Sequence, residues 1–217
     1  MEESTFRETL AEAHSIAPCS TGFESQCIRW YTDHTMTLNT SVIAAPEASE
    51  YAPYYGQYIS LVGGNDIVRT LEEQGRETVT LLSNVSEGQG DHRYAPEKWS
   101  VKEVIGHVTD AERIFTYRAL RIARHDQTPI EGFEQDDYVR AGQFAGRTLA
   151  SLIEEFAAVR RASILMFKSL DGEAWLRRGI ANHKEISVRA IAYLAAGHEL
   201  HHRRILQEKY LAAAAHG

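Results

Sequence analysis

Residues 187–210 read SVRAIAYLAAGHELHHRRILQEKY, and this stretch predicts a long amphipathic helix over about Val188–Leu211. Its apolar side chains recur at intervals of three and four residues, the period of one helical face. Ser187 stands where an N-cap is expected. The face that this pattern defines consists of Val188, Ile191, Ala195, His198, His202 and Leu206. Two imidazoles therefore lie within a stripe that is otherwise apolar.

Three other segments carry the same helical period, over about 65–85, 100–122 and 149–170. Together with the last helix they predict an all-α fold, a four-helix bundle, because amphipathic helices must bury their apolar faces against one another. The link between the second and third helices, residues 124–147, is long and contains Pro129 and three glycines. Such a link can cross over the bundle, so neighbouring helices need not be antiparallel.

The start of the second helix has the clearest signals. Ser100 and Glu103 have the spacing of a capping box, and Trp99 and Val104 match a hydrophobic staple. For the first helix, Asn65 or Gly64 is expected before the first turn. The third is expected to start after Thr148 and to stop near Gly172.

Composition limits the possible classes of function. The 217 residues are 43% hydrophobic, enough for one domain with a core. The net charge of -7 argues against a nucleic-acid partner. No apolar run approaches the roughly 20 residues that span a bilayer, and no export signal opens the chain. We therefore expect a cytoplasmic protein whose two cysteines, Cys19 and Cys27, are reduced.

The first fifty residues are weakly patterned, apart from a possible short helix over Glu2–Ala13. We interpret residues 1–50 as a poorly ordered extension or a mis-assigned start, with Met36 as a candidate initiator, and residues 51–212 as the folded domain. The segment YAPYYGQYISLV (51–62) is expected to lie as an aromatic arm against that domain.

His198 and His202 are separated by four residues, so their ring nitrogens can converge on one point beside the helix. A shared cation would offset the cost of burying two polar rings, although hydrogen-bonded core histidines would do so as well. A metal needs a third ligand, and His107, on the shoulder of the second helix's stripe, is the best-placed candidate. Three imidazole ligands leave a position for water or substrate, as in reactive metal sites.

The other histidines are weaker candidates for metal ligands. His201 projects to the flank of the stripe, where it could support a metal ligand or be solvated, and we expect it to be solvated. The rest fall in predicted loops (His92, His125, His183) or in unpatterned ends (His14, His34, His216).

Residues 198–202, HELHH, also match the H-E-x-x-H signature of zinc peptidases. The longer form of that motif requires Gly and His where this chain has Ile205 and Glu208. Only 15 residues follow His202, which is too few for a distant helix carrying a glutamate ligand. Glu199 could accept a proton beside the metal, but a solvated or salt-bridged glutamate is the simpler interpretation.

Two acidic residues of the second helix follow His107. Glu112 projects to the core side, where a carboxylate needs a partner. It could orient a ligand histidine or pair with an arginine such as Arg189, and the sequence does not decide between these. Asp110 faces the other way.

The chain resembles the DinB/YfiT-like superfamily, in particular the branch called DinB-like domain 2, over about residues 51–211. The resemblance rests on YAPEKWSVKEVIGHVTDAERIF (94–115), ALRIARHDQTPIEGFEQDDYV (119–139) and SVRAIAYLAAGHELHHRRILQEKY (187–210). The family's three-histidine pattern maps onto His107, His198 and His202. The family name refers to damage inducibility and does not imply DNA binding.

This resemblance implies a four-helix bundle with a long crossover, a metal ion between helices and frequent homodimers. Family members include thiol-dependent S-transferases and isomerases that use low-molecular-weight thiols. We therefore expect one divalent metal ion (Zn, Ni or Fe), an unidentified small-molecule substrate, and a metal-dependent transferase or hydrolase. The alternatives are a non-catalytic metal-binding stress-response protein and, more remotely, the peptidase.

Overall fold

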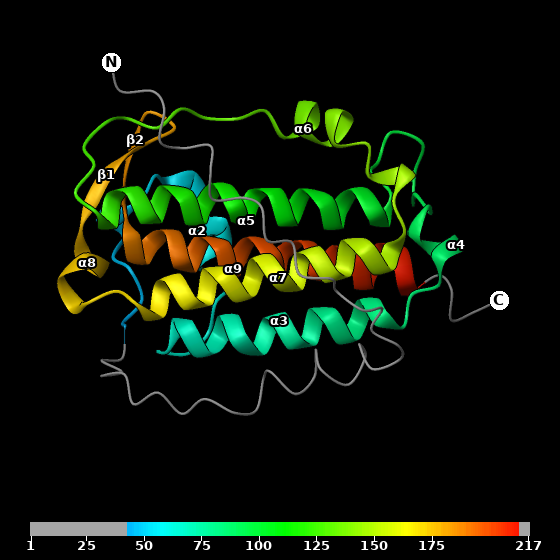
Figure 1. Cartoon of the computed structure of the whole chain (residues 1–217), viewed down its shortest axis with the longest axis horizontal. Coiled ribbons are helices and arrows are strands. Elements are labelled where there is room, and N and C mark those ends of the chain that lie inside the picture. Colours follow the sequence, from blue (N-terminus) through cyan, green and yellow to red (C-terminus); the bar gives the residue numbers. More distant parts are fainter. Residues whose placement is uncertain (1–42, 213–217) are drawn as a thin grey trace, which may run out of the picture. The chain divides into compact units, whose positions relative to one another are not determined.

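The structure is a computed structural model that describes residues 43–212. Four long helices lie side by side in this part of the chain (Figure 1). They are α3 (Ile67–Ser83), α5 (Val101–Ala123), α7 (Leu149–Lys168) and α9 (Val188–Ile205). The predicted all-α four-helix bundle is confirmed.

The link between α5 and α7 crosses the bundle, as the sequence predicts. It contains α6 (Gln135–Gly142) and a 3-10 turn, η3 (Phe144–Gly146), and it returns the chain to the end where α5 began (Figure 1). For this reason α5 and α7 run in the same direction. The crossover packs closely on α5, since a Cβ at Gly106 would lie 2.4 Å from the Phe144 ring.

Three of the four expected N-caps are confirmed. The Ser100, Thr148 and Ser187 side chains each accept a hydrogen bond from the backbone N–H three residues later, and Ser100 and Glu103 form the full capping box. The expected cap of the first helix is wrong. Asp66, and not Asn65 or Gly64, caps α3 by accepting from Arg69 N at 3.0 Å, because its carboxylate reaches the free N–H groups of the first turn.

Two predicted helix ends also differ from the structure. The third helix stops at Lys168, and Gly172 instead begins the short helix α8 (Gly172–Leu176), which Asp171 caps. The last helix is α-helical only to Ile205. It continues as a π-helical turn, η4 (Leu206–Leu211), whose hydrogen bonds span one residue more than those of the α-helix that the period of apolar residues predicts.

The structure contains a β-hairpin that the sequence patterns did not predict. The antiparallel strands β1 (Arg178–Ala181) and β2 (Lys184–Ser187) are joined through Asn182 and His183, both with positive φ. Strands of four residues are too short to show an alternating pattern. An isolated bridge between Ile130 and Ala181 ties the start of the crossover to this hairpin.

The aromatic segment lies against the bundle, as expected. The turn η1 (Ala48–Glu50) precedes it, and the segment itself forms the turn η2 (Pro53–Tyr55) and one turn of helix, α2 (Gly56–Ile59). Tyr51, Tyr55 and Tyr58 pack against the core. The helix α2 approaches α9 so closely that a Cβ at Gly197 would lie 2.1 Å from the Tyr58 carbonyl oxygen.

Most of the predictions for the N-terminal segment concern residues outside the part of the chain that the structure describes. The helix over Glu2–Ala13, the candidate start at Met36 and both cysteines lie outside the described residues. The domain boundary at residue 51 stays a prediction, although Pro46 and Glu50, just before it, are buried.

Apolar side chains form two clusters along the bundle. One contains Ala111, Phe115 and Ala195, and the other contains Val108 and Leu206. His198 and His202 lie between Ala196 of the first cluster and Leu206 of the second, whereas His107 is flanked by Ile105 and Val108 of the second cluster. A short helix, α4 (Glu87–Gly90), precedes α5 in the chain.

Within residues 43–212, no helix has both the length and the apolar character needed to cross a membrane.

Candidate metal centre

The structure brings His107 of α5 together with His198 and His202 of α9. One ring nitrogen from each lies within 4.8 Å of the others. The Nε2 atoms of His107 and His198 are 3.1 Å apart. Two nitrogens bound to one tetrahedral metal at about 2.0–2.1 Å are separated by roughly 3.3 Å. The three donors are therefore close enough together that they could hold one metal ion.

Burial keeps these imidazoles neutral, which is the form that binds metals. His107 and His198 are only 2% and 7% exposed. Burial lowers the pKa of His107 to about 4, and nearby Asp136 of α6 opposes this slightly. Burial, together with the neighbouring imidazoles, lowers the pKa of His202 to about 3. The pKa of His198 lies well below its ordinary value, chiefly because of burial.

Aromatic rings enclose the three histidines on several sides. The Trp99 ring, just before α5, lies 4.7 Å from the His107 ring, measured between centroids. Tyr58 of α2 and Phe115 of α5 each lie 5.5 Å from the His198 ring. The sequence pointed to Trp99 only as a helix staple and to Tyr58 only as part of the arm. Trp99 could have been noticed because its staple position places it over the first turns of α5; nothing in the sequence indicated Tyr58.

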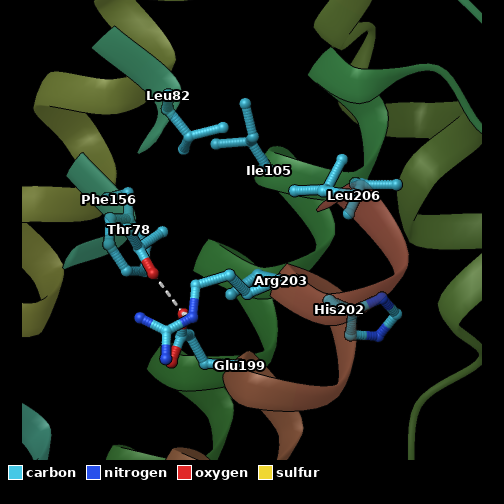
Figure 2. Close-up of a pocket in the computed structure, with 10 residues that line it drawn as sticks. Thr78, Leu82, Ile105, Phe156, Glu199, His202, Arg203 and Leu206 are labelled. Carbon is cyan, nitrogen blue, oxygen red and sulfur yellow. Dashed lines mark hydrogen bonds and ion pairs between the residues drawn. The ribbon is translucent and has the colours of Figure 1, made fainter. Parts of the chain in front are cut away.

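Glu199 is directed away from the three histidines. Its carboxylate accepts a hydrogen bond from the Thr78 hydroxyl of α3, whereas the His202 ring points to the other side of α9 (Figure 2). The residue is 2% exposed and is therefore not solvated. The other expected alternative, a salt bridge, is confirmed, since Arg203 Nε lies 3.7 Å from its carboxylate. Burial raises the pKa of Glu199, although nearby Arg160 and Arg203 oppose that rise.

Beside Glu199 lies a cavity of about 10 Å³, close to the space that one water molecule needs. Its lining residues are Thr78, Leu82, Val104, Ile105, Val108, Phe156, Glu199, His202, Arg203 and Leu206 (Figure 2). The cavity is mostly apolar and lies on the α3 side of α9. Because it has room for only about one water molecule, it is too small for a substrate.

Glu112 pairs with an arginine, which is one of the two alternatives that the sequence left open, but the partner is Arg160 and not Arg189. Both of its oxygens accept hydrogen bonds from Arg160 Nε of α7 at 2.9 Å. Arg160 also donates to the Leu71 carbonyl of α3. This buried pair joins three helices beside the centre. Arg189 instead binds Glu50.

The remaining histidines lie as follows. His201 is half-buried, with its ring 5.3 Å from that of Tyr58, so solvent still reaches part of the side chain. His92, His125 and His183 lie in loops or turns, as predicted. His14, His34 and His216 fall outside the described residues. Asp110 is partly exposed and pairs with Arg113.

Comparison with known proteins shows which family the chain belongs to. A sequence model described as the DinB superfamily matches residues 70–206, which is more than half of the chain. The chain belongs to the DinB superfamily. The matched region contains all three histidines of the candidate centre. No curated protein sequence matches the chain.

A solved structure similar to this DinB-superfamily protein is that of YfiT from Bacillus subtilis. It is described as a probable metal-dependent hydrolase with an unusual four-helix bundle topology. The TM-score is 0.63, and the alignment covers 79% of this chain and 94% of YfiT. At 14% sequence identity, the similarity shows a common fold.

Proposed function

We propose that this protein binds one divalent metal ion through His107, His198 and His202 and uses it in a reaction on a small molecule. The observation that carries the proposal is the convergence of three ring nitrogens within 4.8 Å, from two helices. Zn²⁺, Ni²⁺ and Fe²⁺ are the candidate ions, because neutral imidazole suits all three.

The chain's own residues would prepare the site for chemistry. Three protein ligands leave a coordination position for an exchangeable group. Trp99, Tyr58 and Phe115 exclude water from several sides of the centre. When bound, the ion would supply Lewis acidity and lower the pKa of a bound water or thiol.

Two reaction classes fit this arrangement. Hydrolysis would use water as the nucleophile, and YfiT is described as a probable metal-dependent hydrolase. S-transfer would use a low-molecular-weight thiol, as in other family members that the sequence motifs resemble. The peptidase alternative is not supported, since the Glu199 carboxylate binds Thr78 on the far side of α9.

The first test measures metal content. We expect the wild-type protein to hold about one metal ion per chain, and His198→Ala to lose it, because two imidazoles alone bind far more weakly. His201→Ala is the matched control on the same helix and should keep the ion. Elemental analysis of protein purified without added metal, followed by titration with Zn²⁺ and Ni²⁺, gives the stoichiometry. Equal metal content in His198→Ala and wild type would refute the site.

The second test measures turnover. Metal-loaded protein is assayed with a panel of esters and amides, and with thiols paired with electrophiles. Activity that disappears in His198→Ala and persists in His201→Ala supports a metal-dependent enzyme. Metal binding without activity on any substrate favours the non-catalytic metal-binding stress-response protein. The expected homodimer is part of this proposal, and sedimentation analysis measures it directly.

A further inference from the structure

Arg118 of α5 differs from the other buried charged side chains. It is 4% exposed. Among residues 43–212, every other buried Lys, Arg, Asp or Glu lies within 4 Å of an opposite charge, as in the pairs Arg160–Glu112 and Arg189–Glu50. No carboxylate of this part of the chain pairs with Arg118. Its partner there is the backbone carbonyl of Glu131, which accepts from one terminal nitrogen at 2.8 Å.

The guanidinium of Arg118 is therefore incompletely satisfied. Its Nε has no hydrogen-bond partner within the described residues. Burial lowers the pKa of Arg118, but a guanidinium still keeps its proton at neutral pH. A buried cation without a counter-charge is costly, and an anion relieves that cost.

Two tyrosine side chains lie within electrostatic range of this cation. Tyr55, at the end of η2, and Tyr138 of α6 both act on its charge electrostatically. Tyr138 is 46% exposed and Tyr55 is partly exposed, so solvent reaches this region. Tyrosine hydroxyls can donate hydrogen bonds, and the planar guanidinium can donate two in parallel. Three elements thus provide donors suited to a carboxylate or phosphate.

Arg118 also lies on the metal side of α5. Eleven residues separate it from His107, so the two positions differ by only about 20° around the helix and about 16 Å along it. Helical side chains lean toward the N-terminus, which brings the Arg118 side chain closer to His107. Phe115, one turn before Arg118, contacts His198.

We propose that Arg118, with Tyr55 and Tyr138, forms an anion subsite that holds the carboxylate or phosphate of the substrate or its thiol co-substrate. The reacting group of that small molecule lies at the three histidines, and this second part rests on the proposed function. The fork-like guanidinium gives the subsite its geometric selectivity for such anions.

The test uses the full-length, metal-free protein, so that probes cannot bind a metal ion. Inorganic phosphate and, in a parallel arm, acetate are titrated at constant ionic strength, with binding followed by NMR and by melting temperature. Wild-type protein should bind at least one probe saturably, and the stronger probe identifies the anion class. Arg118→Met should weaken that binding about tenfold or more, because charged hydrogen bonds are lost.

Arg140→Met is the matched control. Arg140 is on α6 in an exposed pair with Asp137, and its loss should leave anion binding unchanged. Arg118→Lys provides a second variant should Arg118→Met fail to fold; it keeps the charge, loses the fork, and should bind several-fold more weakly than wild type. The absence of saturable binding by wild type overturns the subsite, as does equal binding by wild type and the Arg118 variants.

The failure of this subsite can be told apart from failure of the metal centre. His198→Ala, assayed in the same way, should still bind the anion probe, because its mutation lies outside the subsite. Arg118→Lys should still take up one metal ion. Loss of anion binding in His198→Ala would contradict an independent subsite at Arg118.

Discussion

At the scale of single residues, the buried charged side chains within residues 43–212 are matched with an opposite charge, with Arg118 as the exception. Glu112 is only 3% exposed and Arg160 is fully buried, and the hydrogen bonds between them join α5 to α7. A desolvated ion pair adds little stability compared with an apolar pair, but removing one partner leaves the other charge unpaired in the core.

We therefore expect Glu112→Gln to destabilise the protein by about 3 kcal/mol or more, because Arg160 would lose its counter-charge. Chemical denaturation measures the free energy of unfolding. The control is Glu73→Gln, which breaks the exposed pair with Arg69 and should cost less than about 0.5 kcal/mol. Similar losses of unfolding free energy in the two variants would show that the buried charge of Arg160 does not depend on Glu112 more than an exposed pair depends on its partner.

At the scale of elements, the contact between α2 and α9 decides how the aromatic segment meets the metal centre. Gly197 allows the backbone of α2 to touch α9, and this contact places Tyr58 beside His198. Any side chain at position 197 would have to push α2 away, since the obstructing atom is a backbone oxygen.

Gly197→Ala should lower the free energy of unfolding by about 1–3 kcal/mol, despite alanine's better helix propensity, because the added methyl overpacks the contact. Thermal and chemical denaturation measure the change. Gly88→Ala in α4 is the control, since a Cβ there meets no atom within 4 Å, and it should be neutral or slightly stabilising. Greater stability of Gly197→Ala would contradict the close approach of α2.

At the scale of the whole molecule, an ion pair joins segments that are distant in sequence. Glu50 accepts hydrogen bonds from Arg189 and from the Ser187 hydroxyl at the start of α9. Burial by itself would raise the pKa of Glu50, but these hydrogen bonds outweigh it and lower the pKa to about 2.

This pair predicts a pH dependence of stability. The folded-state pKa of Glu50 lies below the value of 4.5 for a free glutamate, so its contribution is complete above pH 4.5 and disappears as pH falls toward 2. The difference in unfolding free energy between wild type and Glu50→Gln should therefore shrink over that range. Denaturation at several pH values measures it. Glu154→Gln, an exposed change on α7, should show no such trend, and a constant difference for Glu50→Gln would contradict the coupling.

Much of the fold could be predicted from local patterns. The period of apolar residues located four helices within a few residues of their ends, and side-chain chemistry located the caps at Ser100, Thr148 and Ser187. These features are decided by neighbours within a turn of helix. The hairpin, the short helices and the π-helical turn were missed or misplaced, because they depend on contacts with other parts of the chain.

The candidate centre, too, could be predicted from the sequence only in part. The spacing of His198 and His202 by itself put two imidazoles on one face of a helix. The position of His107 on the shoulder of the second helix's stripe, and then the family motifs, indicated it as the third ligand. Only the tertiary structure decided that His107 meets them, that Glu112 pairs with Arg160, that Glu199 turns toward Thr78, and that Arg118 is buried without a carboxylate. The physical reason is that a helical repeat fixes directions around one axis, whereas the partner of a buried side chain depends on how separate helices pack against one another.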